Sequence, residues 1–181
     1  MIDLNVVSQR QTDSVDTPPS GYQVLFQKTD GDWYVKDDAG TESFVFSPVR
    51  ASIRSTGETS VSTTADVDKI NAALGTTLTA GKYRVTISYY FNSNVNNRSL
   101  NAKCTIGGTA LSSYDSTFHS EEVRDSNANQ GFLYKRSYLM DFATDTNPTV
   151  RLFFNITATA ATFKVSEAMF EFEKVGGPPP S

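Results

Sequence analysis

The sequence contains little of what builds covalent cross-links, metal centres or catalytic dyads. Its 181 residues include one cysteine and one histidine. One thiol excludes an intramolecular disulfide, and there is no CxxC pair or Cys/His cluster to hold zinc. Cys104 falls among apolar residues that alternate along a strand, so we expect a buried structural thiol. We expect no cofactor, and folding has to rely on the packing of apolar side chains.

Charge is also scarce, and no segment concentrates it. Sixteen Lys and Arg residues against 20 Asp and Glu residues give a net charge of −4. Nucleic-acid binding depends on clustered cations, so we exclude nucleic acid as a partner. No apolar run is long enough to span a bilayer, and the first residues lack the basic and apolar regions of a signal peptide. We therefore expect no membrane insertion, and synthesis in a cytoplasm without export by a signal peptide.

Groups for catalysis are sparse as well. His119 has Glu121 and Glu122 beside it, which makes a metal site conceivable, but the segment has the composition of a loop and offers no further ligand. There is no G-x-S-x-G motif, and any triad would have to use the single histidine. Paired carboxylates for glycoside cleavage stay open, because their spacing exists only in space. We expect a protein that is not an enzyme, and solvated loop charge around His119.

What the sequence has in abundance is alternation of apolar and polar residues. Positions 78–92 alternate aromatic and β-branched residues with polar ones, which predicts a strand with one buried face. An apolar strand face is best covered by a second sheet, so the pattern predicts a β-sandwich. The expected inward residues are Tyr83, Val85, Ile87, Tyr89 and Phe91, then Leu100, Ala102, Cys104 and Ile106, and then Val150, Leu152, Phe154 and Ile156.

The last strand, over 161–175, changes its parity. Phe163 and Val165 precede the change at Ser166-Glu167, and Ala168, Phe170 and Phe172 follow it. One extra residue at that point predicts a β-bulge. Over 64–75 the apolar residues instead recur with a helical period, which predicts a short helix with Thr64 as N-cap and Gly75 just beyond its end.

The first 20 residues have an apolar start and end in a rigid Pro18-Pro19 pair, which indicates an arm followed by a spacer. A frayed terminus is the alternative. We favour an arm that docks on another protein. Its expected contact residues are Ile2, Leu4, Val6 and Val7.

Positions 21–47 contain three short strand-like runs separated by turn residues such as Asp30-Gly31. This pattern predicts a three-stranded meander. A module of well under about 40 residues needs cross-links, metal or association to be stable, so we expect self-association. Docking on the sandwich of the same chain is the alternative. The expected trimer interface is formed by Tyr22, Val24, Phe26, Trp33 and Val35.

A spaced set of turn and charged residues occupies this segment: Pro19, Gly21, Leu25, Lys28, Asp30, Gly31, Tyr34, Lys36, Asp37, Gly40 and Glu42. Over positions 18–46 this set resembles a hairpin module near the front of many bacteriophage tail-fibre and virion-appendage proteins. In that family the module lies between a virion-attachment segment and a distal head, and the proteins are usually trimers. The resemblance implies a homotrimer attached to a capsid or tail protein, although no fibrous shaft or collagen-like repeat follows here.

About eight short strands, with Leu78, Gly81, Tyr83 and Val85 opening the central one, resemble jelly-roll heads of the trimeric tumour-necrosis-factor and complement-C1q type. We therefore expect an all-β chain: an arm (1–20), a three-stranded meander (21–47), an antiparallel jelly-roll β-sandwich (48–175) and a flexible Pro-rich tail (176–181).

The functional hypothesis from the sequence is a structural virion protein of a tailed phage, located in the virion as a trimeric head fibre, decoration protein or small tail appendage. The alternative is a free carbohydrate-binding or adhesion module of the β-sandwich class. In either, the long polar loop over 109–130 is where recognition of a host-surface glycan is expected. The candidate contact residues are Tyr114, Phe118, His119, Arg124 and Asn127.

Overall fold

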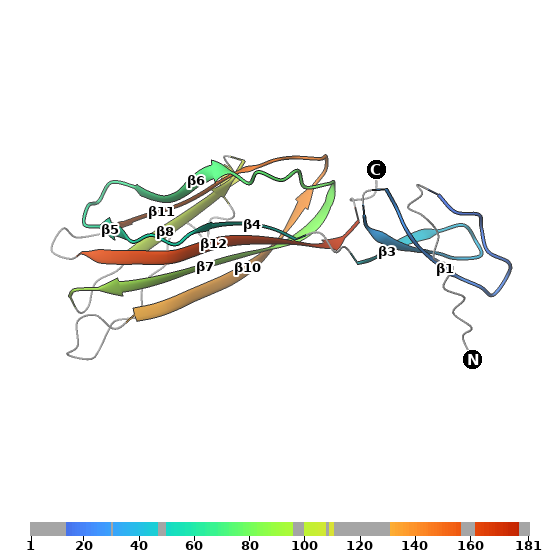
Figure 1. Cartoon of the computed structure of the whole chain (residues 1–181), viewed down its shortest axis with the longest axis horizontal. Helices are drawn as coiled ribbons and strands as arrows, with labels where there is room; N and C mark the ends of the chain where they lie inside the picture. The colour runs from blue at the N-terminus through green and yellow to red at the C-terminus, as the bar shows by residue number, and fades with distance from the viewer. Residues whose placement is uncertain are drawn as a thin grey trace.

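The computed structural model describes residues 14–29, 31–46, 50–95, 100–107, 109–110, 131–156 and 162–177. These residues form twelve β-strands and no helix. A small sheet and a larger sandwich lie one after the other along the long axis of the molecule (Figure 1). The expected all-β class, with a meander ahead of a sandwich, is confirmed.

The meander consists of β1 (Val24–Gln27), β2 (Trp33–Lys36) and β3 (Glu42–Phe46), paired antiparallel in that order. Each connection contains a glycine with positive φ, 86° at Gly31 and 84° at Gly40. Glycine adopts this conformation without the steric cost that a Cβ would bring. The chain therefore reverses where the turn residues predicted it.

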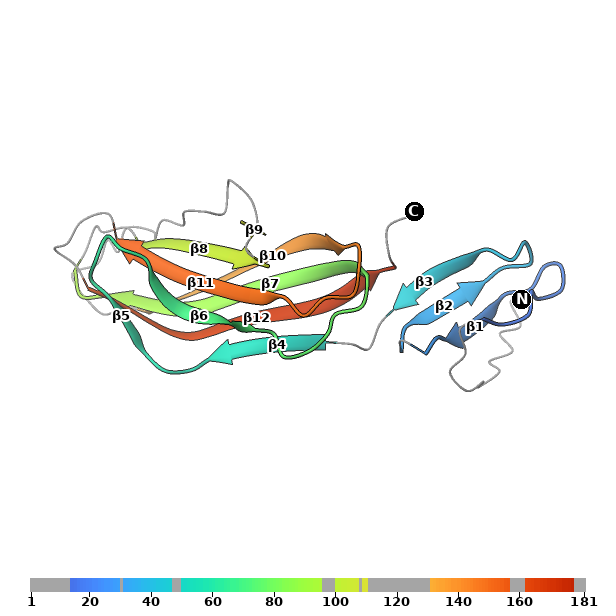
Figure 2. The ribbon, with the colours of Figure 1, turned by 90° about the horizontal axis from the view of Figure 1, so that it is seen from above.

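The sandwich has the strand order of a jelly roll. One sheet runs β10-β7-β12-β4, with β5 also paired to β12, and the other runs β6-β11-β8-β9. β4 thus pairs with the last strand, β12, and β6 with β11, which is the nesting that two Greek keys produce. Figure 2 shows the second sheet lying over the first. The bounds are β4 (Arg50–Ser55), β5 (Thr59–Val61), β6 (Val67–Ala73), β7 (Gly81–Ser93), β8 (Leu100–Ile106), β9 (Thr109–Ala110), β10 (Gly131–Phe142), β11 (Thr149–Ile156) and β12 (Phe163–Gly176).

The core of the sandwich is built from the alternating residues of β7, β8, β11 and β12. All the inward residues expected on these strands are buried, and they form one apolar cluster. Cys104 lies in this cluster as a free, buried thiol. The bulge in β12 is present as well: the register with β7 shifts between Ser166 and Met169, and Glu167 has a φ of 51°.

The expected helix over 64–75 is wrong. Val67–Ala73 is strand β6, which pairs antiparallel with β11, with Ile70 opposite Leu152. Ile70 and Leu74 are buried on the sandwich core, so their contacts stabilise the extended conformation of this segment. Pairing and burial outweigh local periodicity in a segment this short. Because the described residues contain no helix, none of them forms a helical membrane span.

Candidate functional site

One face of the meander is covered by the segment that precedes it. Residues 14–18, here called the strap, place Val15 against Phe26 and Tyr34, and all three side chains are buried. The Lys36 ammonium donates a hydrogen bond of 2.8 Å to the Val15 carbonyl and holds the strap in place. The meander therefore has a small apolar core of its own, separate from that of the sandwich.

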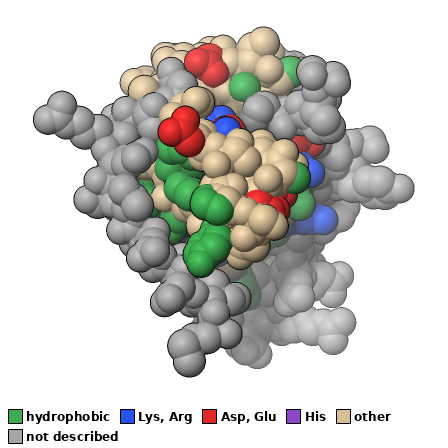
Figure 3. Space-filling view, turned by 90° about the vertical axis from the view of Figure 1, so that its right-hand side faces the viewer, with side chains coloured by type: hydrophobic (Ala, Val, Ile, Leu, Met, Phe, Trp, Pro, Cys, Tyr) green, Lys and Arg blue, Asp and Glu red, His purple; other side chains and the backbone are tan. Residues whose placement is uncertain are grey.

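The opposite face of the meander is apolar and only partly covered. The register puts Leu25 beside Val35, and Trp33 stacks on Phe46 with ring centroids 5.6 Å apart. Phe46 is 47% exposed. We call Leu25, Trp33, Val35 and Phe46 the open meander face. Viewed from the meander end, hydrophobic side chains gather on the surface next to acidic ones (Figure 3). A contiguous apolar patch of this kind typically marks an interface.

The five residues expected at a trimer interface do not lie on one surface. Val24 and Phe26 belong to the covered face, and Trp33 and Val35 belong to the open meander face. Tyr22 precedes β1 and is 52% exposed. The trimer itself stays a prediction, and its contact set becomes the open meander face together with Tyr22.

Phe46 was missed because a bulge in the hairpin of β2 and β3 is invisible to simple alternation, and Leu25 because it lies on the face of β1 opposite to the expected Val24 and Phe26. Phe44 and Phe46 are two residues apart, so simple alternation places them on one face. The pairing of β2 with β3 shifts between Trp33 and Tyr34, so Phe44 pairs with Tyr34 and Phe46 with Trp33. The extra residue turns the two phenylalanines to opposite faces.

The other expected sites lie outside the described residues. These are the anchor residues Ile2, Leu4, Val6 and Val7 and the candidate glycan contacts Tyr114, Phe118, His119, Arg124 and Asn127. Within the described part of the chain, no group of three His, Cys, Asp or Glu residues is arranged to hold a metal ion.

A buried ion pair joins the meander to the sandwich. The Lys174 ammonium, near the end of β12, donates hydrogen bonds to the Asp32 carboxylate and, at 2.8 Å, to the Thr79 hydroxyl. Both charged side chains are almost completely buried. The Tyr83 hydroxyl donates to the Thr79 carbonyl at 3.0 Å, and burial raises the pKa of Tyr83. The alternative of docking on the same chain is thus realised at this contact.

Gly81 makes room for this junction. A Cβ at Gly81 would lie 2.5 Å from the Lys174 Cε atom and 2.7 Å from the Gly176 carbonyl oxygen. Such distances are too short for real contacts, so glycine lets the lysine chain pass β7 and reach Asp32. Sequence reasoning missed this ion pair. The inward parity of β12, continued two residues beyond Phe172, would have pointed to an inward Lys174.

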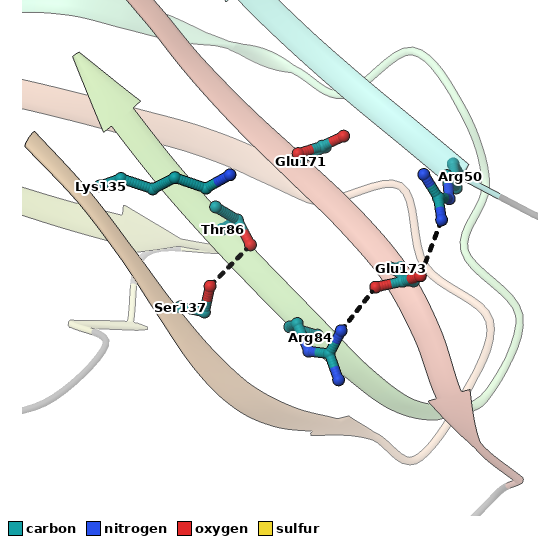
Figure 4. A pocket seen from close by; sticks show the side chains of 7 residues that line it. All are labelled: Arg50, Arg84, Thr86, Lys135, Ser137, Glu171 and Glu173. Carbon is teal, nitrogen blue, oxygen red and sulfur yellow. Dashed lines mark hydrogen bonds and ion pairs between the residues drawn. The ribbon is translucent and has the colours of Figure 1, made fainter. Parts of the chain in front are cut away.

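The outer face of the sheet β10-β7-β12-β4 carries a shallow polar depression of about 250 Å³. Its floor is formed by the hydroxyls of Thr86 and Ser137, which are 2.8 Å apart. Glu173 accepts hydrogen bonds of 3.0 Å from both Arg50 and Arg84 (Figure 4). Lys135 and Glu171 complete the lining. Sequence alternation assigns these side chains to the outer face, but it does not reveal which strands are neighbours.

This depression is suited to contact with a polar ligand and poorly suited to catalysis. Its hydroxyls have no histidine beside them among the described residues, so they lack the base that nucleophilic catalysis requires. Glu173 is engaged by two arginines, and the site is open to water on an exposed sheet face. Catalytic electrostatics depend on a site from which water is excluded. Ammonium, guanidinium and hydroxyl groups instead offer hydrogen bonds to a polar surface.

No family model matches the chain, and no curated protein matches its sequence. Among solved structures it is similar to particles of infectious bursal disease virus. For T=1 particles derived from this virus, the identity is 9% and the TM-score 0.48, covering 82% of this chain and 42% of that one. For the VP2 subviral particle, the identity is 11% and the TM-score 0.49, covering 74% and 35%. For dimeric latent PorU from Porphyromonas gingivalis, the identity is 16% and the TM-score 0.45, and the match covers 69% of this chain and 13% of that one. The chain spans less than half the length of each.

Proposed function

We propose that this chain is a structural virion protein that forms a homotrimer through its meander, attaches by its N-terminal arm and displays the jelly-roll sandwich outward. The observation that carries the proposal is the open meander face. It is an apolar surface immediately after the arm, on a module whose other face is already covered. The resemblance of the hairpin segment to phage appendage proteins supports a head fibre, decoration protein or small tail appendage.

Self-association through this face follows from the energetics of a small sheet. Three strands of four or five residues provide little core: the apolar cluster on the covered face consists of three buried side chains, with Val24 and Phe44 packed against them. Burying apolar surface contributes roughly 25 cal/mol per Å². Copies that bring Leu25, Trp33, Val35 and Phe46 together would bury the surface that one chain leaves open. A closed ring about one axis satisfies every copy equally.

Display of the sandwich follows from the junction. Lys174 and Asp32 are buried and hydrogen-bonded, so the meander is held to the sandwich by a directional contact. The sandwich core includes no residue of the meander or the strap. Attachment and display are therefore assigned to opposite ends of one molecule, with the capsid or tail protein as partner of the arm.

The test is the mass of the protein in solution. Phe46→Asp and Trp33→Asp place a charge on the open meander face and should abolish the three-fold association, so that sedimentation equilibrium no longer detects a trimer. Tyr90→Asp, on the outer face of the sandwich, is the matched control because Tyr90 is also a partly exposed aromatic residue. Unchanged circular dichroism would show that the variants fold. A trimer that survives both charged variants would contradict the proposed interface.

The alternative function is a carbohydrate-binding module, and the polar depression is the observation that favours it. Arg50, Arg84 and Lys135 offer donors around the Thr86 and Ser137 hydroxyls, a combination that can bind sugar hydroxyls. Glycan-array binding by the Phe46→Asp variant, which lacks the meander contact, would favour this function if Lys135→Ala abolishes the binding. Binding that requires the virion-bound trimer would instead make adhesion a part of the proposed one.

A further inference from the structure

Strand β10 leaves one long edge of the sandwich without a partner among the described residues. It runs over Gly131–Phe142 and pairs with β7 without interruption, from Gly131 opposite Asn92 to Phe142 opposite Gly81. It is the terminal strand of its sheet (Figure 1). Edge strands are usually protected by prolines, bulges, shortness or charged side chains, because their free N–H and C=O groups are a template for another strand. β10 is twelve residues long and has neither proline nor bulge, and its charged residues are Lys135, Arg136 and Asp141.

Both faces of β10 carry apolar residues that are partly exposed. Leu133 and Leu139, on the outer face, are 70% and 67% exposed and are the most exposed of the large hydrophobic residues described. On the inner face a row of side chains packs on the core cluster and is only partly buried. This row consists of Phe132, Tyr134, Tyr138, Met140 and Phe142.

The apolar and aromatic residues of β10 are arranged symmetrically about Arg136. Reading outward in both directions, Lys135 corresponds to Ser137, Tyr134 to Tyr138, Leu133 to Leu139 and Phe132 to Met140. In an antiparallel pair, residues directly opposite each other share a face and lie about 4.5–5.5 Å apart at Cβ. Two copies of β10 centred on Arg136 would therefore place leucine on leucine, tyrosine on tyrosine and Phe132 on Met140.

We infer that two copies of this chain pair antiparallel through β10 about a two-fold axis at Arg136, joining their sheets into one. The occupant of the edge is a second copy because the pattern is complementary to itself. A shift of the register by two residues would set Leu133 against Asp141 or Ser137 and would separate the leucines. This contact uses a surface distinct from the open meander face and goes beyond the proposed function. Together, a three-fold and a two-fold contact would link trimers to one another.

Arg136 is the one unfavourable residue in this register, because it faces its own copy. Its guanidinium carbon lies 5.6 Å from the centroid of the Tyr138 ring, so each arginine lies over an aromatic face of its own chain. Like charges opposite each other weaken a strand pair, and salt screens them. The pairing should therefore strengthen as salt is raised. Mixing native chains with Arg136→Glu chains should favour mixed pairs over either homogeneous pair.

Cysteine cross-linking tests the register directly. A mixture of Leu133→Cys and Leu139→Cys chains should form disulfide-linked pairs, and Arg136→Cys chains should link to themselves. Leu133→Cys alone should not, because two copies of position 133 would lie six residues, or about 20 Å, apart along the strands. Cys104 is buried and does not compete. Equal linking of Leu133→Cys with itself, or no linking in the mixture, overturns the inference.

A mass measurement separates this contact from the proposed trimer. The Phe46→Asp variant removes the meander contact, so it should sediment as a dimer through β10. Adding Leu133→Glu and Leu139→Glu to Phe46→Asp should convert this dimer to a monomer. Adding Lys135→Glu and Ser137→Glu instead is the control for added negative charge near the centre of β10, and it should weaken the pairing less. If Phe46→Asp is monomeric under conditions where the native chain is trimeric, the edge pairing is wrong while the proposed function stands. A strand of another protein on this edge would give that same result.

Discussion

The residues that decide how the two parts of the molecule meet are Asp32 and Lys174, which lie 142 positions apart in the sequence. Each charge is stabilised by the other in a place that water does not reach. Removing two charges from water costs several kcal/mol per ion, which the attraction and the Thr79 hydrogen bond have to offset. The pair therefore contributes to the orientation of the meander on the sandwich more than to net stability. Removing one partner should destabilise the fold more than removing both.

Replacing one partner alone should be costly. Lys174→Met leaves the Asp32 carboxylate buried without its ammonium, and we expect it to lower the free energy of unfolding by about 3–5 kcal/mol. The double variant Asp32→Leu/Lys174→Met should recover much of that loss, because no charge remains buried. Urea unfolding of the three proteins measures the difference. A single variant as stable as the native protein would show that the pair is not a fixed contact.

Gly81 is the second residue on which the junction depends. Gly81→Ala puts a methyl group against Lys174 and the Gly176 carbonyl, and we expect it to cost about 1–3 kcal/mol by overpacking. Gly57→Ala is the matched control: its Cβ would meet nothing within 4 Å, and its φ is not positive. Thermal unfolding should therefore separate the two substitutions. Similar melting temperatures would mean that Lys174 moves aside without cost.

Buried tyrosines make the sandwich sensitive to alkaline pH. Burial is the largest cause that raises the pKa of Tyr89 above its ordinary value of 10.0. A folded pKa above the unfolded one means that the neutral phenol stabilises the fold fully below pH 10 and progressively less as the pH rises beyond it. The native protein should therefore lose stability above pH 10 faster than Tyr89→Phe, as followed by circular dichroism. Identical decline of the two proteins would contradict this.

At the scale of elements, the strands were predictable wherever burial alternates along a single strand. Tyr83 to Phe91 on β7 and Val150 to Ile156 on β11 follow that rule, and so does the bulge before Ala168 on β12. β6 was mistaken for a helix because a strand with few inward residues can imitate helical spacing. Its identity depends on pairing with β11, which is distant in sequence.

The packing of the strap on the meander was not predicted from the sequence. Sequence reasoning assigned residues 1–20 to an arm, but Val15 and Pro18 are buried and Lys36 binds the Val15 carbonyl. The Pro pair that indicated a spacer thus follows a segment that packs on the meander. The sequence of a short apolar segment does not indicate which surface the segment packs on. A truncation that separates the arm from the meander therefore has to end at residue 13.

At the scale of the whole molecule, the sequence predicted the two parts and their order but neither of the surfaces that would join copies. The open meander face depends on an extra residue in β3 opposite Trp33 and Tyr34, and the terminal position of β10 among the described strands depends on sheet order. Both are properties of pairing across strands. The two contacts proposed here are therefore one through the open meander face and one through β10.

Imaging of intact virions at near-atomic resolution tests the central claim most directly. The proposed function predicts that virions containing this chain carry it as trimers, with the meanders around a three-fold axis, residues 1–13 in contact with a capsid or tail protein and the sandwiches directed outward. Particles made with a chain lacking residues 1–13 are the control and should lack the trimer, although that chain folds. Complete particles that contain no density for this chain, or that carry it attached through the sandwich, would contradict the account.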